Sequence, residues 1–258
     1  MAKESEVRVM SGWNPWHGCH RYSPGCDRCY VYRADARHGR DSTAVTRTGQ
    51  FALPLKRDRR GAYTLRPDGD YVYTCFSSDF LVEEADAWRA EAWDMIRTRH
   101  DLHFFFITKR ITRLSACLPP DWGDGWDNVT VGCTCENQLC ADRRLPVFLS
   151  LPLHHRHIVC EPLLTPIDLS LFLTGGIEQV TAGGESGEGA RVCDDMWIRS
   201  LREQCLRASV SFLFHQTGAN YRRDGRIYPI PRALQHEQAR RSGYSFGKTA
   251  EQKGEPYG

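Results

Sequence analysis

Short apolar runs alternate with amphipathic stretches along most of this chain, and this alternation constrains the fold more than any other feature. Apolar runs of about four to eight residues are typical of buried strands, whereas apolar residues spaced three and four apart are typical of helices. Strands are predicted at residues 71–80 (the first half), 103–110, 128–137, 155–163, 178–187 and 210–218. Helices are predicted at 84–100, 111–118, from about 138, and at 194–208, where Asp194 is the expected N-cap and Trp197, Leu201, Cys205 and Ala208 the buried stripe.

The order of these elements predicts an α/β protein. Each strand is a nearly continuous apolar run followed by a helix, which is typical of a parallel sheet buried on both faces. With a weak strand near residues 7–10, we count about seven βα units. This number favours a full or incomplete (β/α) TIM-like barrel over an open doubly wound sheet.

Polar or glycine-rich clusters follow the predicted strands. Active sites of (β/α) barrels are built from the carboxyl ends of the strands, so six clusters in series support the barrel. The clusters are Ser77–Asp79, Thr108–Arg110, Glu136–Asn137, Glu161, Gly183–Ser186 and His215–Gln216.

The βα rhythm stops near residue 219. We therefore expect a barrel over 1–218 and a basic, irregular C-terminal extension over 219–258. Residues 221–258 contain eight Lys and Arg against four Asp and Glu, although the whole chain carries only +2. Such a tail is either solvated or a surface that contacts phosphates.

Nothing in the sequence predicts a membrane or secreted location. No apolar run approaches the roughly 20 residues of a spanning helix, and the N-terminus lacks the apolar core of a secretion signal. We expect a cytoplasmic protein with no membrane partner, where the eleven cysteines stay reduced. A tight cysteine cluster in such a compartment suggests metal binding.

Cys19, Cys26 and Cys29 form that cluster, with the spacing C-x6-C-x2-C on the loop after the first predicted strand. Three thiolates leave one coordination position open, which suits a [4Fe–4S] cluster. Zinc, with His17 or His20 as the fourth ligand, is the main alternative. A dithiol redox pair and purely structural thiols remain open as well. Cys133, Cys135 and Cys140 are expected to be small core residues.

The stretch WNPWHGCHRYSPGCDRCY resembles the signature of a phage- and prophage-associated three-Cys-motif family of unknown function. The resemblance continues through SSDF, ITKR, VGCTCENQ, CEPLLTPIDL and AGGESGEGAR and covers roughly residues 12–218. The cysteine loop is also similar to that of radical S-adenosylmethionine enzymes, which share the barrel fold. Their usual C-x3-C-x2-C spacing is shorter by three residues, and Arg28 stands where they carry an aromatic residue.

This second resemblance implies a set of cofactors and partners. Cys19, Cys26 and Cys29 would hold a [4Fe–4S] cluster, S-adenosylmethionine would bind its open iron, and a flavodoxin or ferredoxin would supply electrons. The methionyl amine would meet Gly183, Gly184 and Glu185, or else Asp79, and a cation such as Lys109 would meet the carboxylate. We therefore expect cofactor-binding residues at the strand ends: Ser78, Asp79, Lys109, Glu136, Asn137, Glu161, Gly183, Gly184 and Glu185.

Several of these residues also have a purely structural interpretation. Asp79 could stabilise a helix start, Lys109 and Glu161 could pair with other strand-end charges, and the Gly-Gly turn could simply lead into a helix.

The leading hypothesis is a radical-S-adenosylmethionine-like enzyme that abstracts hydrogen from an unknown substrate, with nucleic acid as one candidate class. No catalytic side chain can be named from the sequence. The alternative is a zinc-stapled, non-enzymatic barrel that binds nucleic acid or a partner protein. No nucleophile elbow and no H-E-x-x-H helix supports a hydrolase.

Overall fold

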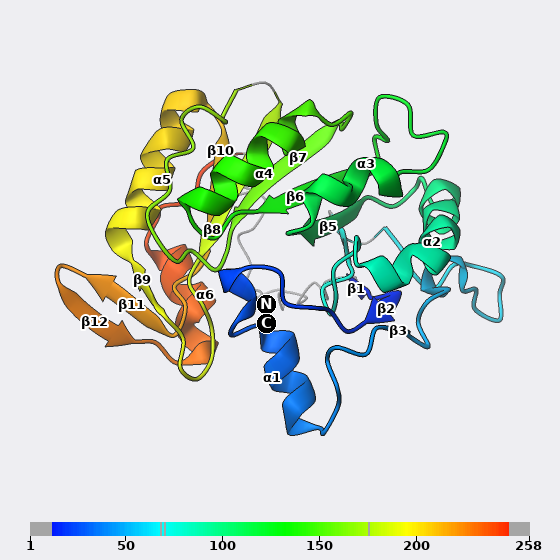
Figure 1. Ribbon diagram of the computed structural model, residues 1–258, viewed down its shortest axis with the longest axis horizontal. Helices are drawn as coiled ribbons and strands as arrows, with labels where there is room; N and C mark the ends of the chain where they lie inside the picture. Colours follow the sequence, from blue (N-terminus) through cyan, green and yellow to red (C-terminus); the bar gives the residue numbers. More distant parts are fainter. Residues whose placement is uncertain (1–11, 68, 70, 175, 248–258) are drawn as a thin grey trace, which may run out of the picture.

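A curled, seven-stranded parallel sheet forms the centre of the molecule (Figure 1). The computed structural model describes residues 12–67, 69, 71–174 and 176–247. The strands are β1 (Gly12–Trp13), β4 (Val72–Thr74), β5 (Phe104–Thr108), β6 (Val129–Thr134), β7 (His155–Cys160), β8 (Ile177–Gly183) and β10 (Ser211–Gln216).

Strand order in space follows strand order in the chain, β1-β4-β5-β6-β7-β8-β10. A doubly wound sheet would reverse its order near the middle, whereas a (β/α) barrel adds each strand beside the last. Within the described residues β1 and β10 are the two edges and do not pair with each other. The prediction of a parallel α/β sheet is confirmed, and the barrel is incomplete. The strand expected at 7–10 lies outside the described residues.

Helices α2, α3, α4 and α5 lie in succession along the outer side of the curl (Figure 1). Their bounds are α1 (Tyr30–Arg37), α2 (Asp86–Thr98), α3 (Leu114–Cys117), α4 (Gln138–Ser150), α5 (Asp195–Ala208) and α6 (Arg232–Arg241). Single 3₁₀ turns are η1 (Pro24–Cys26), η2 (Leu53–Leu55), η3 (Glu83–Ala85) and η4 (Ile111–Arg113). None of the helices in the described ranges is long and apolar enough to cross a bilayer.

Aromatic side chains fill the space between the sheet and the outer helices. Phe106 on β5 stacks on Phe80 with ring centroids 4.7 Å apart, and Phe80 contacts Trp93 on α2 at 5.0 Å. Phe104, two residues earlier on the same face, packs against Trp13 at 5.7 Å. Apolar residues point to both faces of β5, which is why the strand shows in the sequence as a continuous apolar run.

The helix predicted at 194–208 is confirmed as α5, and the side chain of Asp194 caps it by accepting from the Met196 amide at 2.9 Å. The predicted buried stripe is correct for Leu201 and Cys205 only. Ile198 is buried, whereas Trp197 is half-buried and Ala208 is exposed. The helix is therefore rotated slightly from the face that the sequence suggested.

The inner face of the sheet is less buried than expected for a sheet covered on both sides. Tyr73, Ile107, Thr181 and Leu213 point to this face and are only half-buried. An incomplete barrel accounts for the difference, because its missing strands would otherwise close over this face.

The prediction of an irregular C-terminal extension is wrong for the described residues. Strand β11 (Asn220–Arg223) forms a hairpin with β12 (Arg226–Pro229) and pairs in parallel with β9 (Val192–Asp194). Helix α6 packs against β10. The sequence concealed these elements because β12 is exposed at every residue and α6 buries only Gln235 and Ala239, so neither shows a clear apolar period.

The first crossover differs from the others, because between β1 and β4 the chain does not run through one helix on the outer side. It forms the cysteine loop, α1, and a small sheet of β2 (Trp16–His17) and β3 (Thr46–Arg47). Helix α1 projects from the open side of the curl in Figure 1. This crossover positions the candidate site.

Candidate functional site

The cysteine loop, residues 18–29, lies across the carboxyl ends of the central strands. The amide of Gly18 donates to the carbonyl of Ser77, just after β4, at 3.2 Å. Arg110, just after β5, places Nη1 3.5 Å from the Sγ of Cys19. The amide of Gly25 donates to Oε1 of Glu136, just after β6, at 3.2 Å. The loop therefore occupies the end of the sheet where barrel active sites are built.

The three thiols lie in one neighbourhood of this loop. Cys26 is buried in η1 and Cys29 precedes α1, and the amide of Cys29 donates to the carbonyl of Cys26 at 3.2 Å. The hydroxyl of Tyr32 on α1 donates to the carbonyl of Cys19. Burial, with the charges of Cys19, Cys26 and Cys29, raises the pKa of Tyr32 to about 12. Burial, only partly opposed by Arg110, also raises the pKa of the Cys19 thiol to about 11.

The donor set fits an iron–sulfur cluster or zinc by its chemistry, since both bind thiolates. In the described ranges no three His, Cys, Asp or Glu side chains already converge as a metal site. The thiols would have to lose their protons and draw together around a metal, as metal binding coupled to local ordering requires.

Asp79 and Arg110 form a buried ion pair beside Cys19. Nη1 of Arg110 lies 3.2 Å from Oδ2 of Asp79, and both side chains are almost fully buried. Asp79 also accepts from the hydroxyl of Thr108 at 2.8 Å and from the amide of Leu81 at 2.9 Å. The helix-start interpretation of Asp79 is thus only part of its role, because its carboxylate joins β4 to β5 next to the cysteine loop.

Glu136 holds the Ser-Pro-Gly turn of the cysteine loop. Its carboxylate accepts from the hydroxyl of Ser23 and the amide of Gly25, and it forms a 2.7 Å ion pair with Arg144 on α4. Burial opposes ionisation of Glu136, but Arg144 and Lys109 outweigh it and keep its pKa below the usual range. Glu136 therefore acts on the position of the loop.

Lys109 lies on the same side of the turn. A Cβ at Gly25 would be 3.3 Å from Cε of Lys109 and 3.2 Å from Oε1 of Glu136. Lys109 thus adds a positive charge between the strand end and the cysteine loop.

Ser78 and Asn137 have local structural partners. The hydroxyl of Ser78 donates to the carbonyl of Gly18 and so fixes the start of the cysteine loop. The Oδ1 of Asn137 accepts from the amide of Cys140 at 2.9 Å and caps α4. Cys133, Cys135 and Cys140 are buried, as expected for core residues.

Glu161 and the Gly183–Gly184 pair pack against one another. A Cβ at Gly183 would lie 2.8 Å from the carboxyl carbon of Glu161, and one at Gly184 would overlap the carbonyl of Thr217. Glu161 is held by His215, with Nδ1 2.8 Å from Oε2, and by the side-chain amide of Gln216. The absence of a side chain at Gly183 leaves room for the carboxylate of Glu161, and its absence at Gly184 leaves room for the backbone at Thr217. Both contacts lie at the mouth of the half-barrel.

Glu185 is already neutralised by Arg191. Its Oε2 accepts from the backbone amide of Arg191 at 2.9 Å and from Nε at 3.0 Å. Nη2 of Arg191 also donates to the carbonyl of Pro24 at 2.9 Å. The segment after β8 is thereby fastened to the cysteine loop, and Glu185 has little remaining capacity to bind an amine.

His17 and His20 flank the first cysteine, and each meets a carboxylate through Nε2. His17 lies 2.9 Å from Oδ2 of Asp35, a buried carboxylate that also accepts from Ser42 at 2.7 Å. His20 pairs with Glu84. The Nδ1 atoms of both rings would be the ones left to bind a metal.

Sequence reasoning placed the strand-end carboxylates at the mouth and considered pairing with Lys109 or Arg110, but it missed two of their three cationic partners. Arg110, Arg144 and Arg191 neutralise Asp79, Glu136 and Glu185, respectively. Arg110 was visible as part of the strand-end cluster. No sequence signal pointed to Arg144 or Arg191, because both pairings depend on how the chain folds back.

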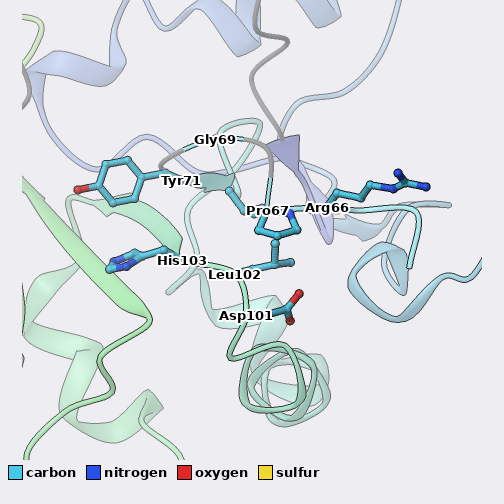
Figure 2. Close-up of a pocket in the computed structure, with 8 residues that line it drawn as sticks. Arg66, Pro67, Gly69, Tyr71, Asp101, Leu102 and His103 are labelled. Carbon is cyan, nitrogen blue, oxygen red and sulfur yellow. The ribbon is translucent and has the colours of Figure 1, made fainter. Parts of the chain in front are cut away.

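A pocket lies at the opposite, amino-terminal ends of β4 and β5 (Figure 2). Tyr71 and His103 flank one side of it, Pro67 and Leu102 lie between, and Asp101 and Arg66 are further round. Because barrel chemistry is built at the other end of the strands, this pocket is not part of the candidate site.

Comparison with known proteins gives one relationship. No curated protein and no solved structure matches this chain. A family model described as "Protein of unknown function (DUF5131)" matches residues 7–253. That range includes the cysteine loop, every strand of the half-barrel and the C-terminal hairpin, and the chain therefore belongs to the DUF5131 family.

Proposed function

We propose that this protein is a radical-S-adenosylmethionine-type enzyme in which Cys19, Cys26 and Cys29 hold a [4Fe–4S] cluster. The observation that carries the proposal is the position of the three-thiol loop across the carboxyl ends of β4, β5 and β6. The resemblance of the loop to that of radical enzymes supports the same function. When bound, such a cluster would supply the electron that cleaves S-adenosylmethionine and so permits hydrogen abstraction from the substrate.

The residues around the loop have roles that suit this function. Arg110 lies beside Cys19 and supplies a buried positive charge next to the thiolates that would hold the cluster. Ser78 and Glu136 hold the two ends of the loop segment between Gly18 and Gly25. Lys109 remains the candidate contact of the S-adenosylmethionine carboxylate. Asp79 and Glu161 would have to exchange their present partners, Arg110 and His215, to bind the amine. A flavodoxin or ferredoxin would be the electron donor.

Anaerobic reconstitution with iron and sulfide tests the proposal. The wild-type protein should bind about four irons per chain, turn brown and lose its visible absorbance on reduction with dithionite. Single Cys→Ser variants at Cys19, Cys26 and Cys29 should lose the cluster. Cys117→Ser, at a buried cysteine outside the loop, is the matched control and should retain it. Equal iron content in all four variants would contradict the assignment.

A second candidate, a zinc site, is favoured by the two histidines. Zinc-bound histidines commonly hold a carboxylate through their other ring nitrogen, and His17 and His20 both contact carboxylates through Nε2. In that case the purified protein would be colourless and contain one zinc per chain. His17→Gln or His20→Gln would lower the zinc content, whereas the iron-loaded form of the first proposal would be unaffected.

A further inference from the structure

The hairpin of β11 and β12 has an outer strand that is exposed at every residue. Figure 1 shows it projecting from the body beyond α6. All four residues of β12 are exposed, and β12 is the outer edge of the three-stranded sheet β12-β11-β9. Residues 219–247, which contain the hairpin and α6, carry six arginines against two acidic residues.

The turn of the hairpin fixes which side chains share a face. Asp224 and Gly225 form the two-residue turn, with φ of 51° and 75°, the conformation that an Asp-Gly pair favours in tight hairpins. In the resulting register Arg223 lies opposite Arg226, and Tyr221 opposite Tyr228. Directly opposed residues of an antiparallel pair point to the same side, so these four side chains form one face.

The two arginines on this face are an unusual pair. Like charges directly opposite each other destabilise a sheet, and their separation is only about 5 Å at Cβ. Arg223 is partly offset by Asp224, with Nε 3.8 Å from Oδ2, and both side chains are well exposed. Within the described residues no carboxylate pairs with Arg226. An anion between the two guanidinium groups would remove the repulsion.

The two tyrosines on this face differ in burial. Tyr221 is buried, packs on Phe214 at 5.8 Å and donates to Asp195 at 2.8 Å. Tyr228, directly opposite, is 46% exposed. The hairpin therefore presents one aromatic ring and two arginines on a support that is held in place by the core.

The base of the hairpin adjoins the candidate site. The amide of Ala219 donates to the carbonyl of Glu185 at 2.9 Å, and the side chain of Asn220 donates to the carbonyl of Ala190 at 2.6 Å. The two acceptors, Glu185 and Ala190, belong to the segment after β8. Arg191 at the end of this segment donates to the carbonyl of Pro24 in the cysteine loop. A chain bound along the hairpin would thus lie next to the mouth of the half-barrel.

We propose that the β11–β12 hairpin is a nucleic-acid-binding ribbon. Arg223 and Arg226 would contact backbone phosphates, for which the guanidinium fork is well suited, and Tyr228 would stack on a base. The binding of nucleic acid by the hairpin does not depend on the proposed function. The further step, that nucleic acid is the substrate class of the cysteine site, rests on the proposed function.

Charges on an edge strand can also serve only to prevent aggregation. That role needs no anion, so a binding measurement separates the two. The measurement is fluorescence anisotropy of a labelled 20-nucleotide (about two helical turns) single strand and of its duplex. Each is titrated with the full-length protein at salt concentrations between about 50 and 200 mM.

Wild-type binding should weaken steeply with salt. Arg223→Gln/Arg226→Gln should reduce affinity about tenfold or more and lower the salt slope by about two, one for each lost phosphate contact. Arg223→Glu/Arg226→Glu should reduce it further. Tyr228→Ala should weaken single-strand binding by at least about fivefold, and Tyr228→Phe should restore it.

Arg59→Gln/Arg60→Gln is the matched control, because it removes the same charge from exposed arginines in the loop before β4. It should leave affinity within about twofold of wild type. An equal loss in both double variants, unchanged binding in Arg223→Gln/Arg226→Gln, or binding of anionic lipid vesicles without binding of either oligonucleotide would each overturn the proposal. Circular dichroism of each variant shows that the fold is retained.

The triple Cys19→Ser/Cys26→Ser/Cys29→Ser variant separates the two proposals. It should bind the oligonucleotides as wild type does, since the hairpin contains none of these residues. If the wild-type protein binds the oligonucleotides but takes up no cluster on reconstitution, the ribbon stands and the enzyme is refuted. If it takes up the cluster but binds neither oligonucleotide, the ribbon alone is refuted.

Discussion

Nη1 of Arg110 lies 3.5 Å from the Sγ of Cys19, although 91 residues separate them in the chain. The same guanidinium forms a 3.2 Å ion pair with Asp79 and donates to the carbonyl of His20 at 2.8 Å. It also lies over the ring of Tyr22, 5.0 Å from the centroid. One buried cation thus joins the first part of the cysteine loop to the ends of two strands.

Replacing Arg110 should therefore affect both stability and metal content. Arg110→Gln would leave the buried carboxylate of Asp79 without its cation, which costs about 3–5 kcal/mol in comparable buried pairs. Urea denaturation measures this loss, and the iron content after reconstitution should fall in the same variant because Cys19 is no longer held.

Arg113→Gln is the control for this change. Arg113 pairs with Glu83 and Asp86, both well exposed, so its loss should cost less than about 1 kcal/mol. If the two variants are equally stable and bind equal iron, Arg110 does not organise the loop.

Gly184→Ala tests the close approach of two backbones at the mouth of the half-barrel. A Cβ there would overlap the carbonyl of Thr217 and lie 2.9 Å from Cβ of Cys193. Because neither neighbour is a flexible side-chain end, we expect a loss of about 3 kcal/mol in the free energy of unfolding. Gly49→Ala, whose Cβ would meet no atom within 4 Å, should be nearly neutral. If Gly184→Ala leaves the free energy of unfolding unchanged, the backbone at Thr217 can shift to accept the added methyl group.

The strands of the half-barrel could be predicted because buried strands require runs of apolar residues, which are visible in the sequence. The strand predicted at 103–110 is β5 (Phe104–Thr108), in which Phe104 and Phe106 pack toward the helices. The short hairpin could not be predicted in the same way. Its outer strand buries nothing, so only the turn residues Asp224 and Gly225 marked it.

The site was predictable in position but not in pairing. Parallel strands bring their carboxyl ends to one edge, so Asp79, Glu136, Glu161 and Glu185 were expected to gather there. Which cation meets which carboxylate depends on loop paths and helix rotation. Arg191, for example, reaches Glu185 because the chain turns back at Gly187 and Gly189, both with positive φ. That pairing also makes the amine-binding role of Glu185 unnecessary to explain its burial.

Arg191 should control the order of the segment that joins β8 to the cysteine loop. Arg191→Gln would remove both the ion pair with Glu185 and the hydrogen bond to Pro24. We expect faster amide exchange at residues 184–191 and 23–29, and a stability loss of about 2–3 kcal/mol from the buried carboxylate. Hydrogen exchange followed by mass spectrometry resolves the two segments.

Arg199→Gln is the comparison for Arg191→Gln. Arg199 is largely exposed and lies 4.0 Å from Asp195, so exchange at both segments should stay at the wild-type rate. Unchanged exchange in Arg191→Gln would mean that other contacts hold the segment.

Glu161 should make the stability of the protein depend on acid pH. Burial opposes its ionisation, but His215 and Gln216 outweigh burial and lower the pKa of Glu161 from its ordinary value of 4.5. A carboxyl with a depressed pKa stabilises the fold above its unfolded-state pKa, and this stabilisation is lost as the pH falls through the folded-state pKa. The melting temperature of the wild type should therefore fall more steeply below about pH 4.5 than that of Glu161→Gln. Glu91→Gln, which removes an exposed partner of Arg47, should follow the wild-type curve. Parallel curves for Glu161→Gln and the wild type would show that Glu161 titrates alike in the folded and unfolded chain.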